Sequence, residues 1–265
     1  MRSLENLIGE IYENKKRVEE EIDMYFLKCE EKFNGYINND TLTHFIKENY
    51  PYQKSKKLSE SIKNSYQIEN IELDEEELES ERKRLVGISK ELYDEFKEKE
   101  TPKISRLISI LSKVEKNSKL RTGPVLINKG DYIPPETPNE IQGEFSNVDY
   151  TLKENDLDPI EKAIHYHYHF VRIHPFKDGN GRSARLLSNS YLFSNDILPS
   201  VIERGERMNY ARLLDKACNS RKKTYEPLIN LTEEEETLFT YLASKINNQY
   251  YNFMSEIKDN KCYNE

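Results

Sequence analysis

The sequence has no tryptophan, and only 9 of its 265 residues are glycine and 3 are cysteine. The cysteines, Cys29, Cys218 and Cys262, lack CxxC spacing, which argues against a disulfide framework or zinc knuckle and favours a reducing compartment. No apolar run approaches the roughly 18 residues of a membrane-spanning helix, and acidic residues interrupt the first apolar positions. We therefore expect a cytoplasmic protein without a signal peptide or membrane anchor.

An excess of charge of one sign is also lacking, because 40 basic and 48 acidic residues leave a net charge of −8. Such a mixed, slightly acidic surface is not expected to attract nucleic acid. The length suits one large domain or two smaller ones, each with a sizeable core. The totals are therefore compatible with one enzyme-sized unit.

Apolar residues recur at helical spacing through most of the chain. This pattern predicts amphipathic helices over residues 3–33, 72–100 and 104–116. Residues 120–138 differ, because an apolar run there is followed by the turn signal Lys129–Gly130–Asp131 and by a proline pair. This stretch predicts a short β-hairpin or flap in an otherwise helical protein.

A further helix is expected to begin at Asp158, which can cap the helix before Pro159 at its first position and Glu161 three residues after the cap. Apolar residues then follow at helical spacing as far as His174. Because Pro175 disfavours helical geometry in the residue before it, the helix should end there.

Two of the few glycines, Gly179 and Gly181, lie in the next loop, and another helical pattern starts after Gly181. Glycines let the backbone present N–H groups without obstruction, and the N-terminus of a helix attracts anions. Arg182 and Arg185 follow three residues apart, so both guanidinium groups can reach the same bound phosphates. The loop is therefore predicted to be an anion cradle.

Two further side chains complete a candidate active site. Asp178 offers a hard oxygen ligand for Mg²⁺ held jointly with phosphates, and the ordinary pKa range of His174 suits a general base. Together with the cradle they predict phosphoryl or nucleotidyl transfer. The plainer alternative is that DGNG is a turn between packed helices and that the arginines lie on the surface.

Residues 174–185, HPFKDGNGRSAR, resemble the Fic family signature HxFx[D/E]GNGRxxR at every specified position. The resemblance extends to LRTGPVLI with YIPP, to HYHFVRIHPF, and to the later RMNYARLLDKA and TYEPLINL, covering residues 101–232. It implies an all-α Fic core with a β-hairpin flap, an N-terminal helical region over 1–100 and a C-terminal helix over 233–265. The implied function is protein adenylyltransferase: AMP moves from ATP to a hydroxyl group of a protein.

The resemblance also implies roles for single residues. His174 would deprotonate the attacking hydroxyl, Asp178 would bind Mg²⁺, and Phe176 would be a buried anchor of the loop. The implied nucleotide-binding residues are Lys177, Asp178, Gly179, Asn180, Gly181, Arg182, Arg185 and Tyr210. Among them Asn180 and the glycine backbone would hold the transferred phosphate, and the arginines would hold the β- and γ-phosphates.

Partners follow from the same resemblance. A target protein would present a tyrosine, threonine or serine hydroxyl, and the enzyme would also modify itself. No membrane partner is expected. Homo-oligomerisation is left open. The flap would align the target by main-chain pairing. The flap residues are Thr122, Gly123, Pro124, Val125, Leu126 and Ile127.

An inhibitory motif is expected upstream of the core. Class II Fic proteins are similar in carrying a helix with the motif [S/T]xxxE[G/N], which residues 65–70, SYQIEN, match. In an inhibitory helix over about residues 60–72, Glu69 would pair with Arg185 in place of the γ-phosphate, with Ser65 as the first motif residue. Among the glutamates followed by glycine or asparagine, only Glu69 has serine or threonine four residues earlier.

Other readings of the sequence stay open. The same site could remove AMP from a modified protein, or could belong to a catalytically silent nucleotide-binding interaction module. Fic proteins that phosphorylate carry lysine after the asparagine, where this chain has Gly181 and Arg182. The histidines at 165, 167 and 169 lack the HExxH spacing of zinc proteases; we expect His167 in the core and His165 and His169 on the surface.

Overall fold

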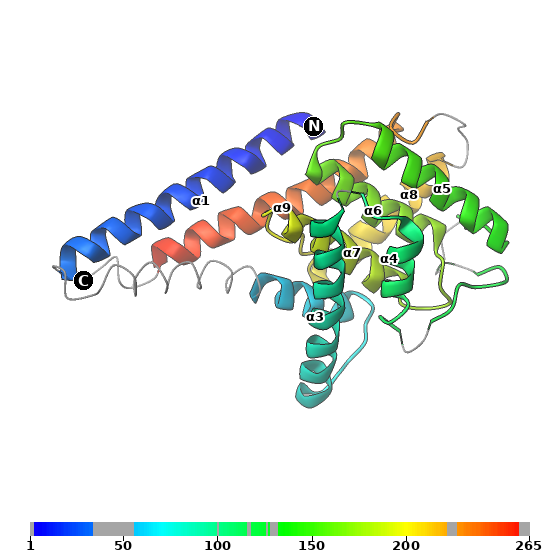
Figure 1. The fold of residues 1–265 in the computed structure, drawn as a ribbon, viewed down its shortest axis with the longest axis horizontal. Coiled ribbons are helices and arrows are strands. Elements are labelled where there is room, and N and C mark those ends of the chain that lie inside the picture. Colours follow the sequence, from blue (N-terminus) through cyan, green and yellow to red (C-terminus); the bar gives the residue numbers. More distant parts are fainter. Residues whose placement is uncertain are drawn as a thin grey trace.

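The computed structural model describes residues 3–33, 56–99, 101–115, 118–125, 127, 132–221 and 227–259. Over these ranges the chain contains helices and no strand, so the all-α prediction is confirmed (Figure 1). None of the helices described has a stretch long and apolar enough to cross a membrane.

Two long helices form one side of the molecule. Helix α1 (Leu4–Phe33) lies beside α9 (Glu233–Asp259), and the two run in the same direction (Figure 1). A buried hydrogen bond from Asn14 Nδ2 to Asn247 Oδ1, 2.8 Å long, joins them. Both helices match the sequence prediction over the residues described.

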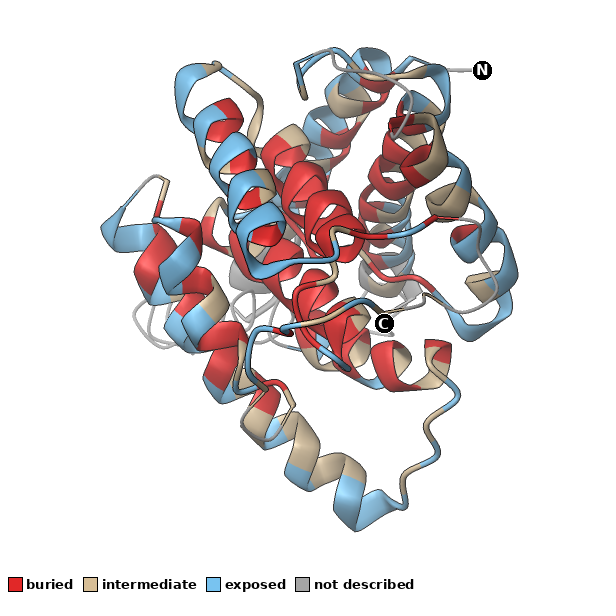
Figure 2. Ribbon diagram, turned by 90° about the vertical axis from the view of Figure 1, so that its right-hand side faces the viewer, coloured by how far each residue is buried: buried red, intermediate tan, exposed pale blue. Residues whose placement is uncertain are grey.

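The centre of the molecule is formed by α6 (Pro159–Ile173) and α7 (Asn180–Ser194), which pack against each other. Every residue of α6 except Pro159 and Glu161 is buried, and buried residues gather in the middle of the helical assembly (Figure 2). The reason is that α5 (Pro138–Glu154) and α9 also pack on α6.

The predicted start of α6 is confirmed. Asp158 Oδ1 accepts a hydrogen bond from the Ile160 N–H at 2.7 Å, and Glu161 Oε2 accepts one from the Asp158 N–H at 3.0 Å. This capping box satisfies backbone donors that have no partner within the helix. The Tyr12 hydroxyl donates to Asp158 Oδ2 at 3.0 Å, which ties α1 to the same point.

The expectation that His165 and His169 lie on the surface is wrong, because both are buried. Their rings stack 5.4 Å apart, with 3.2 Å between His165 Nδ1 and His169 Nε2, and the Arg172 Nε donates to His169 Nδ1 at 3.3 Å. Because other helices pack on several sides of α6, no face of this helix is exposed to solvent. The helical spacing of its apolar residues did not reveal this. Burial lowers the pKa of His165 to about 3, so the ring is neutral near pH 7.

Helix α3 (Glu75–Glu98) packs against α7 and α4 (Ile104–Leu111). Helix α4 ends five residues before the predicted position 116, and residues 112–115 form a turn. The turn is held because Arg84 of α3 donates to two of its carbonyls.

A further helix covers residues 56–68. The other helical elements described are η1 (Arg204–Glu206) and α8 (Arg207–Arg221), and α8 packs against α9. No strand is present in the described part of 120–138, and the predicted turn at 129–131 lies outside the described residues. The hairpin therefore stays a prediction.

Candidate active site

The loop between α6 and α7 is shaped by an unusual backbone conformation at His174. Its φ of 53° and ψ of 58° lie in the left-handed region, and its N–H donates to the Phe170 carbonyl at 3.1 Å. Few non-glycine residues adopt this conformation, and such strain is kept where the surroundings determine it. The sharp reversal ends α6 at Ile173, as Pro175 predicts, and leaves the His174 side chain only partly buried.

The loop is braced from inside by Asn180 and Phe176. Asn180 Oδ1 accepts from the Phe176 N–H at 2.9 Å, and Asn180 Nδ2 donates to the Phe176 carbonyl at 2.8 Å. The Phe176 ring is 1% exposed and lies 5.9 Å from the ring of Phe170. The side-chain amide of Asn180 is thus used to hold the loop. The group that Asn180 can offer to an anion is therefore its backbone N–H.

The His174 ring is oriented by a hydrogen bond to its own helix. Nδ1 lies 3.2 Å from the Val171 carbonyl oxygen. Because a carbonyl can only accept, this contact places the proton on Nδ1 and leaves the lone pair of Nε2 as the basic position. Burial, partly opposed by the bond to Val171, lowers the pKa of His174 below its ordinary value of 6.5. The imidazole is therefore neutral and able to accept a proton near pH 7.

Helix α7 begins at Asn180, two residues before the predicted start after Gly181, because Gly179 caps it with a φ of 75°. The N–H groups of Asn180, Gly181 and Arg182 occupy the first turn and have no partner within the helix. The side chains of Arg182 and Arg185 are only 6% and 9% exposed. Buried cations beside free helical N–H groups make a strong anion site.

The Ser65–Asn70 segment lies directly on this anion site. A helix covers residues 56–68, so it ends before the predicted position 72, and Glu69 lies in the turn that follows. The helix ends because Asn70 adopts a left-handed φ of 56°, with the Ile71 N–H bonded to the Tyr66 carbonyl at 3.1 Å. Glycine and asparagine tolerate this conformation best, which gives a physical reason for the last position of the motif.

The Glu69 carboxylate bridges both arginines. Oε1 lies 2.7 Å from Arg185 Nη2, and Oε2 lies 2.7 Å from Arg182 Nε. Ser65 Oγ accepts from Arg185 Nε at 2.7 Å. The contact with Arg185 is the one expected from the motif, whereas the contact with Arg182 was not anticipated.

A second carboxylate at the site was missed in the sequence. Glu115, in the turn after α4, forms an ion pair with Arg182 Nη1. Its side chain also presses on the loop, since a Cβ added at Gly179 would lie 2.5 Å from Glu115 Cγ. No motif marks Glu115, which stands in a lysine- and glutamate-rich run like many others in the chain.

Asp178 and Lys177 lie on the solvent side of the loop. Both are exposed, and the Asp178 side chain retains 79% of its accessible surface. One exposed carboxylate beside a phosphate site fits Mg²⁺, which is usually held by one or two carboxylates together with phosphates and water. The described residues contain no cluster of three or more candidate metal ligands, so the metal would depend on the nucleotide for its other ligands.

The remaining predicted site residues, Tyr210 and those of the flap, differ in how far they are buried. Tyr210 is buried, and its hydroxyl lies 2.8 Å from His167 Nε2, so His167 is the hydrogen-bonded core histidine that was predicted. Burial raises the pKa of Tyr210 to about 12. Of the flap residues, Thr122 and Pro124 are exposed, Gly123, Val125 and Ile127 are partly buried, and Leu126 lies outside the described residues.

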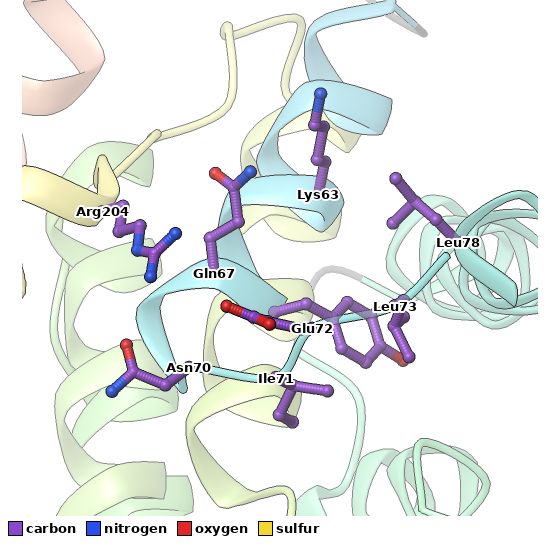
Figure 3. Close-up of a pocket in the computed structure, with 9 residues that line it drawn as sticks. Lys63, Gln67, Asn70, Ile71, Glu72, Leu73, Leu78 and Arg204 are labelled. Carbon is purple, nitrogen blue, oxygen red and sulfur yellow. The ribbon is translucent and has the colours of Figure 1, made fainter. Parts of the chain in front are cut away.

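A pocket of about 330 Å³ lies beside the Ser65–Asn70 segment. Figure 3 shows that Gln67 and Asn70 of this segment share its wall with Glu72 and with Arg204 of η1. The pocket therefore borders the turn that carries Glu69.

The central part of the chain is similar to known proteins. The sequence profile of the Fic/DOC family matches residues 73–192, which include α3 and the loop between α6 and α7. Protein adenylyltransferase Fic of Nematostella vectensis is 36% identical over 119 residues, and the Drosophila mojavensis protein of that name is 32% identical over 124 residues. These alignments cover 43% and 45% of this chain but only 27% and 24% of the relatives.

Solved structures agree on the fold. A Fic domain containing signaling protein of Bacteroides thetaiotaomicron superposes with a TM-score of 0.63 at 22% identity, covering 92% of this chain and 98% of that one. Fic-1 of C. elegans (residues 134–508) gives 0.56 at 20% identity, covering 92% and 73%. Residues 73–192 therefore match the Fic/DOC family, and this match includes the loop from His174 to Arg185 between the two central helices.

Proposed function

We propose that this protein is an adenylyltransferase that moves AMP from ATP to a tyrosine, threonine or serine hydroxyl of a target protein, and that Glu69 inhibits it. One observation carries the proposal. A carboxylate from a segment far away in the sequence lies between Arg182 and Arg185 at the N-terminus of α7, where it occupies an anion site. The names of the related adenylyltransferases agree with an anion site that takes nucleotide phosphates.

The chemistry follows from the positions of the side chains. Nε2 of His174 accepts the proton of the target hydroxyl, whose oxygen forms a bond to the α-phosphorus of ATP. The bond between that phosphorus and the oxygen leading to the β-phosphate breaks, and pyrophosphate leaves. The N–H groups at the start of α7 stabilise the charge that grows on the α-phosphoryl oxygens, while both arginines hold the outgoing phosphates.

A bound Mg²⁺ would neutralise part of the phosphate charge and orient the phosphates. Asp178 is the residue of this chain that would hold it, because its exposed carboxylate lies at the start of the cradle. The Asp178 Oδ1 also accepts the Gly179 N–H at 2.7 Å, which fixes the carboxylate next to the phosphate site.

Inhibition by Glu69 follows from competition for the same cations. While its carboxylate is bonded to Arg185 and Arg182, the γ-phosphate cannot take these donors without displacing it. ATP would then bind with its α-phosphorus out of line with the attacking oxygen. Ser65 adds to this inhibition because its hydroxyl and carbonyl oxygens both accept from Arg185.

The direct test is mass spectrometry of purified Glu69→Gly protein incubated with ATP and Mg²⁺. We expect covalent species heavier by one AMP, located on hydroxyl side chains by peptide mapping. Release of pyrophosphate without any modified protein, or no turnover at all, would contradict the proposal. The latter result would favour a silent nucleotide-binding module.

Removal of AMP is a second candidate activity, favoured by the position of the Glu69 carboxylate inside the loop. A Cβ at Gly181 would lie 2.8 Å from Glu69 Oε1, so this carboxylate is close enough to the loop to orient a water molecule there. Self-modified Glu69→Gly protein, freed of ATP, is the substrate for the test. Release of AMP on adding unmodified wild-type protein would establish the hydrolase.

The depressed pKa of His174 predicts the pH dependence of transfer. A base whose pKa lies below 6.5 stays unprotonated at neutral pH, so kcat/KM should be flat near pH 7 and fall only below pH 6.5. Transfer by the Glu69→Gly protein, measured from pH 5 to 8 with labelled ATP, checks this. An acidic limb centred above 6.5 would contradict it.

A further inference from the structure

Arg121 is buried against the backbone of the His174 turn. It is 2% exposed, and its guanidinium donates from Nε to the His174 carbonyl at 2.6 Å and from Nη2 to the Ile173 carbonyl at 3.2 Å. Its own N–H donates to the Pro175 carbonyl at 2.9 Å. These carbonyls lie at the C-terminal end of α6, where a cation is favoured.

The same guanidinium also bonds Gly123, near the start of the flap segment (residues 122–127). Nη1 donates to the Gly123 carbonyl at 2.9 Å, and Nη2 also donates to the carbonyl of Pro135, just before α5. A planar group with five N–H donors in fixed directions can hold several carbonyls at once. One buried cation thus joins the segment expected to align the target to the turn that carries the base.

We propose that Arg121 is a positioning residue for transfer: it fixes the His174 turn and the base of the flap segment relative to each other. The inference rests on the proposed adenylyltransferase function. The His174 backbone is in a conformation that non-glycine residues rarely adopt, and its carbonyl receives a short hydrogen bond from Arg121. Small displacements of a catalytic base have large effects on rate.

The test is Arg121→Lys in the Glu69→Gly protein. Lysine keeps the charge but has one nitrogen, which cannot meet carbonyls from four residues. We expect kcat for transfer to fall on the order of 10- to 100-fold, with KM for ATP changed less than about twofold, since the cradle does not use Arg121. Rates are normalised to the binding stoichiometry of α,β-methylene-ATP, which cannot release pyrophosphate.

Arg221→Lys is the matched control. Arg221 is also buried and donates to the Asn230 carbonyl at 2.7 Å, but it bonds the segment between α8 and α9. The Arg221→Lys substitution should lower Tm while leaving the normalised kcat unchanged. An Arg121→Lys protein with unchanged kcat, or one that fails to fold, would assign Arg121 to stability alone and overturn the inference.

A readout without turnover separates this inference from the proposed function. The NMR signals of the His174 ring, assigned by comparison with His174→Asn, should shift in Arg121→Lys and stay in place in Arg221→Lys. If the Glu69→Gly protein is inactive, the proposed transfer activity is rejected, but the role of Arg121 in positioning His174 is not. Unmoved His174 signals would reject the role of Arg121.

The Glu115 ion pair carries a second, independent inference. The turn that holds Glu115 is fixed by Arg84, whose Nη2 donates to the Val114 carbonyl at 2.8 Å. Arg84 pairs with Glu81, and Glu81 accepts from the Tyr66 hydroxyl at 2.5 Å. Because Tyr66 belongs to the Ser65–Asn70 segment, the two carboxylates at the cradle are connected through α3.

We infer that Glu115 is a second inhibitory carboxylate, which pairs with Arg182 in addition to the bridge that Glu69 forms between Arg182 and Arg185. This deepens the proposed function by adding a regulator of the same site. Removing Glu69 then removes the carboxylate bonded to Arg185, while Arg182 remains paired with Glu115, so the inhibition of phosphate binding is only partly relieved.

Calorimetric titration with α,β-methylene-ATP and Mg²⁺ tests this without requiring transfer. Glu115→Gln in the Glu69→Gly protein should tighten Kd on the order of tenfold, because a charge-assisted hydrogen bond no longer competes with phosphate. Glu91→Gln is the control: it removes a surface ion pair with Lys113, 2.6 Å long, near the same turn. Unchanged or weaker binding in Glu115→Gln would overturn the inference, the weaker case indicating a carboxylate that supports Mg²⁺.

Discussion

Replacing Glu69 with glycine is expected to raise the rate of self-modification with labelled ATP by about 10- to 100-fold. A hydrogen bond to a charged group is worth about 1.5–3 kcal/mol, which corresponds to this range. The Glu69 carboxylate is bonded to Arg185 and to Arg182, each at 2.7 Å. Its loss makes both guanidinium groups partly available to the phosphates of ATP. Restoring the in-line position of the α-phosphorus could increase the effect further.

The control for this change is Glu72→Gly, which removes an exposed carboxylate three residues away on the wall of the neighbouring pocket. Its rate should stay within about twofold of wild type, because surface substitutions outside special contacts have small effects. Equal rates for wild type and Glu69→Gly would show that the contact between Glu69 and the arginines does not restrain the enzyme.

Changing His174 to alanine in the Glu69→Gly protein should lower the transfer rate by about 10²- to 10⁴-fold, the contribution typical of a positioned general base. Binding of α,β-methylene-ATP should persist, because the glycine backbone and the two arginines that form the cradle are untouched. Quenched assays with labelled ATP measure the first quantity, and calorimetry measures the second.

His174→Asn separates the loss of the base from a disturbance of the backbone. Asparagine tolerates the left-handed conformation that His174 adopts, with its φ of 53°, better than alanine does, yet it cannot accept the proton. Both variants should therefore be equally inactive. An asparagine variant that retains most of the activity would show that His174 shapes the loop rather than acting as the base.

Both expectations depend on local signals that were legible in the sequence. The capping pattern at Asp158 and Glu161 and the proline after His174 set the two ends of α6, because they act through neighbouring backbone groups. The glycines at 179 and 181 allow the close approaches seen at the start of α7. Ser65 and Glu69 were found because a short motif records a contact between segments 116 residues apart.

Only the tertiary structure could reveal Glu115, Arg121 and the burial of the histidine pair. With 40 basic and 48 acidic residues in the chain, sequence cannot indicate which carboxylate meets Arg182. Arg121 acts on carbonyls 53 residues away that carry no side-chain signature. Helical spacing shows where an apolar stripe lies, but the burial of His165 and His169 depends on how many helices pack around α6. Local patterns thus determine where helices and loops begin, whereas long-range packing decides which charges meet there.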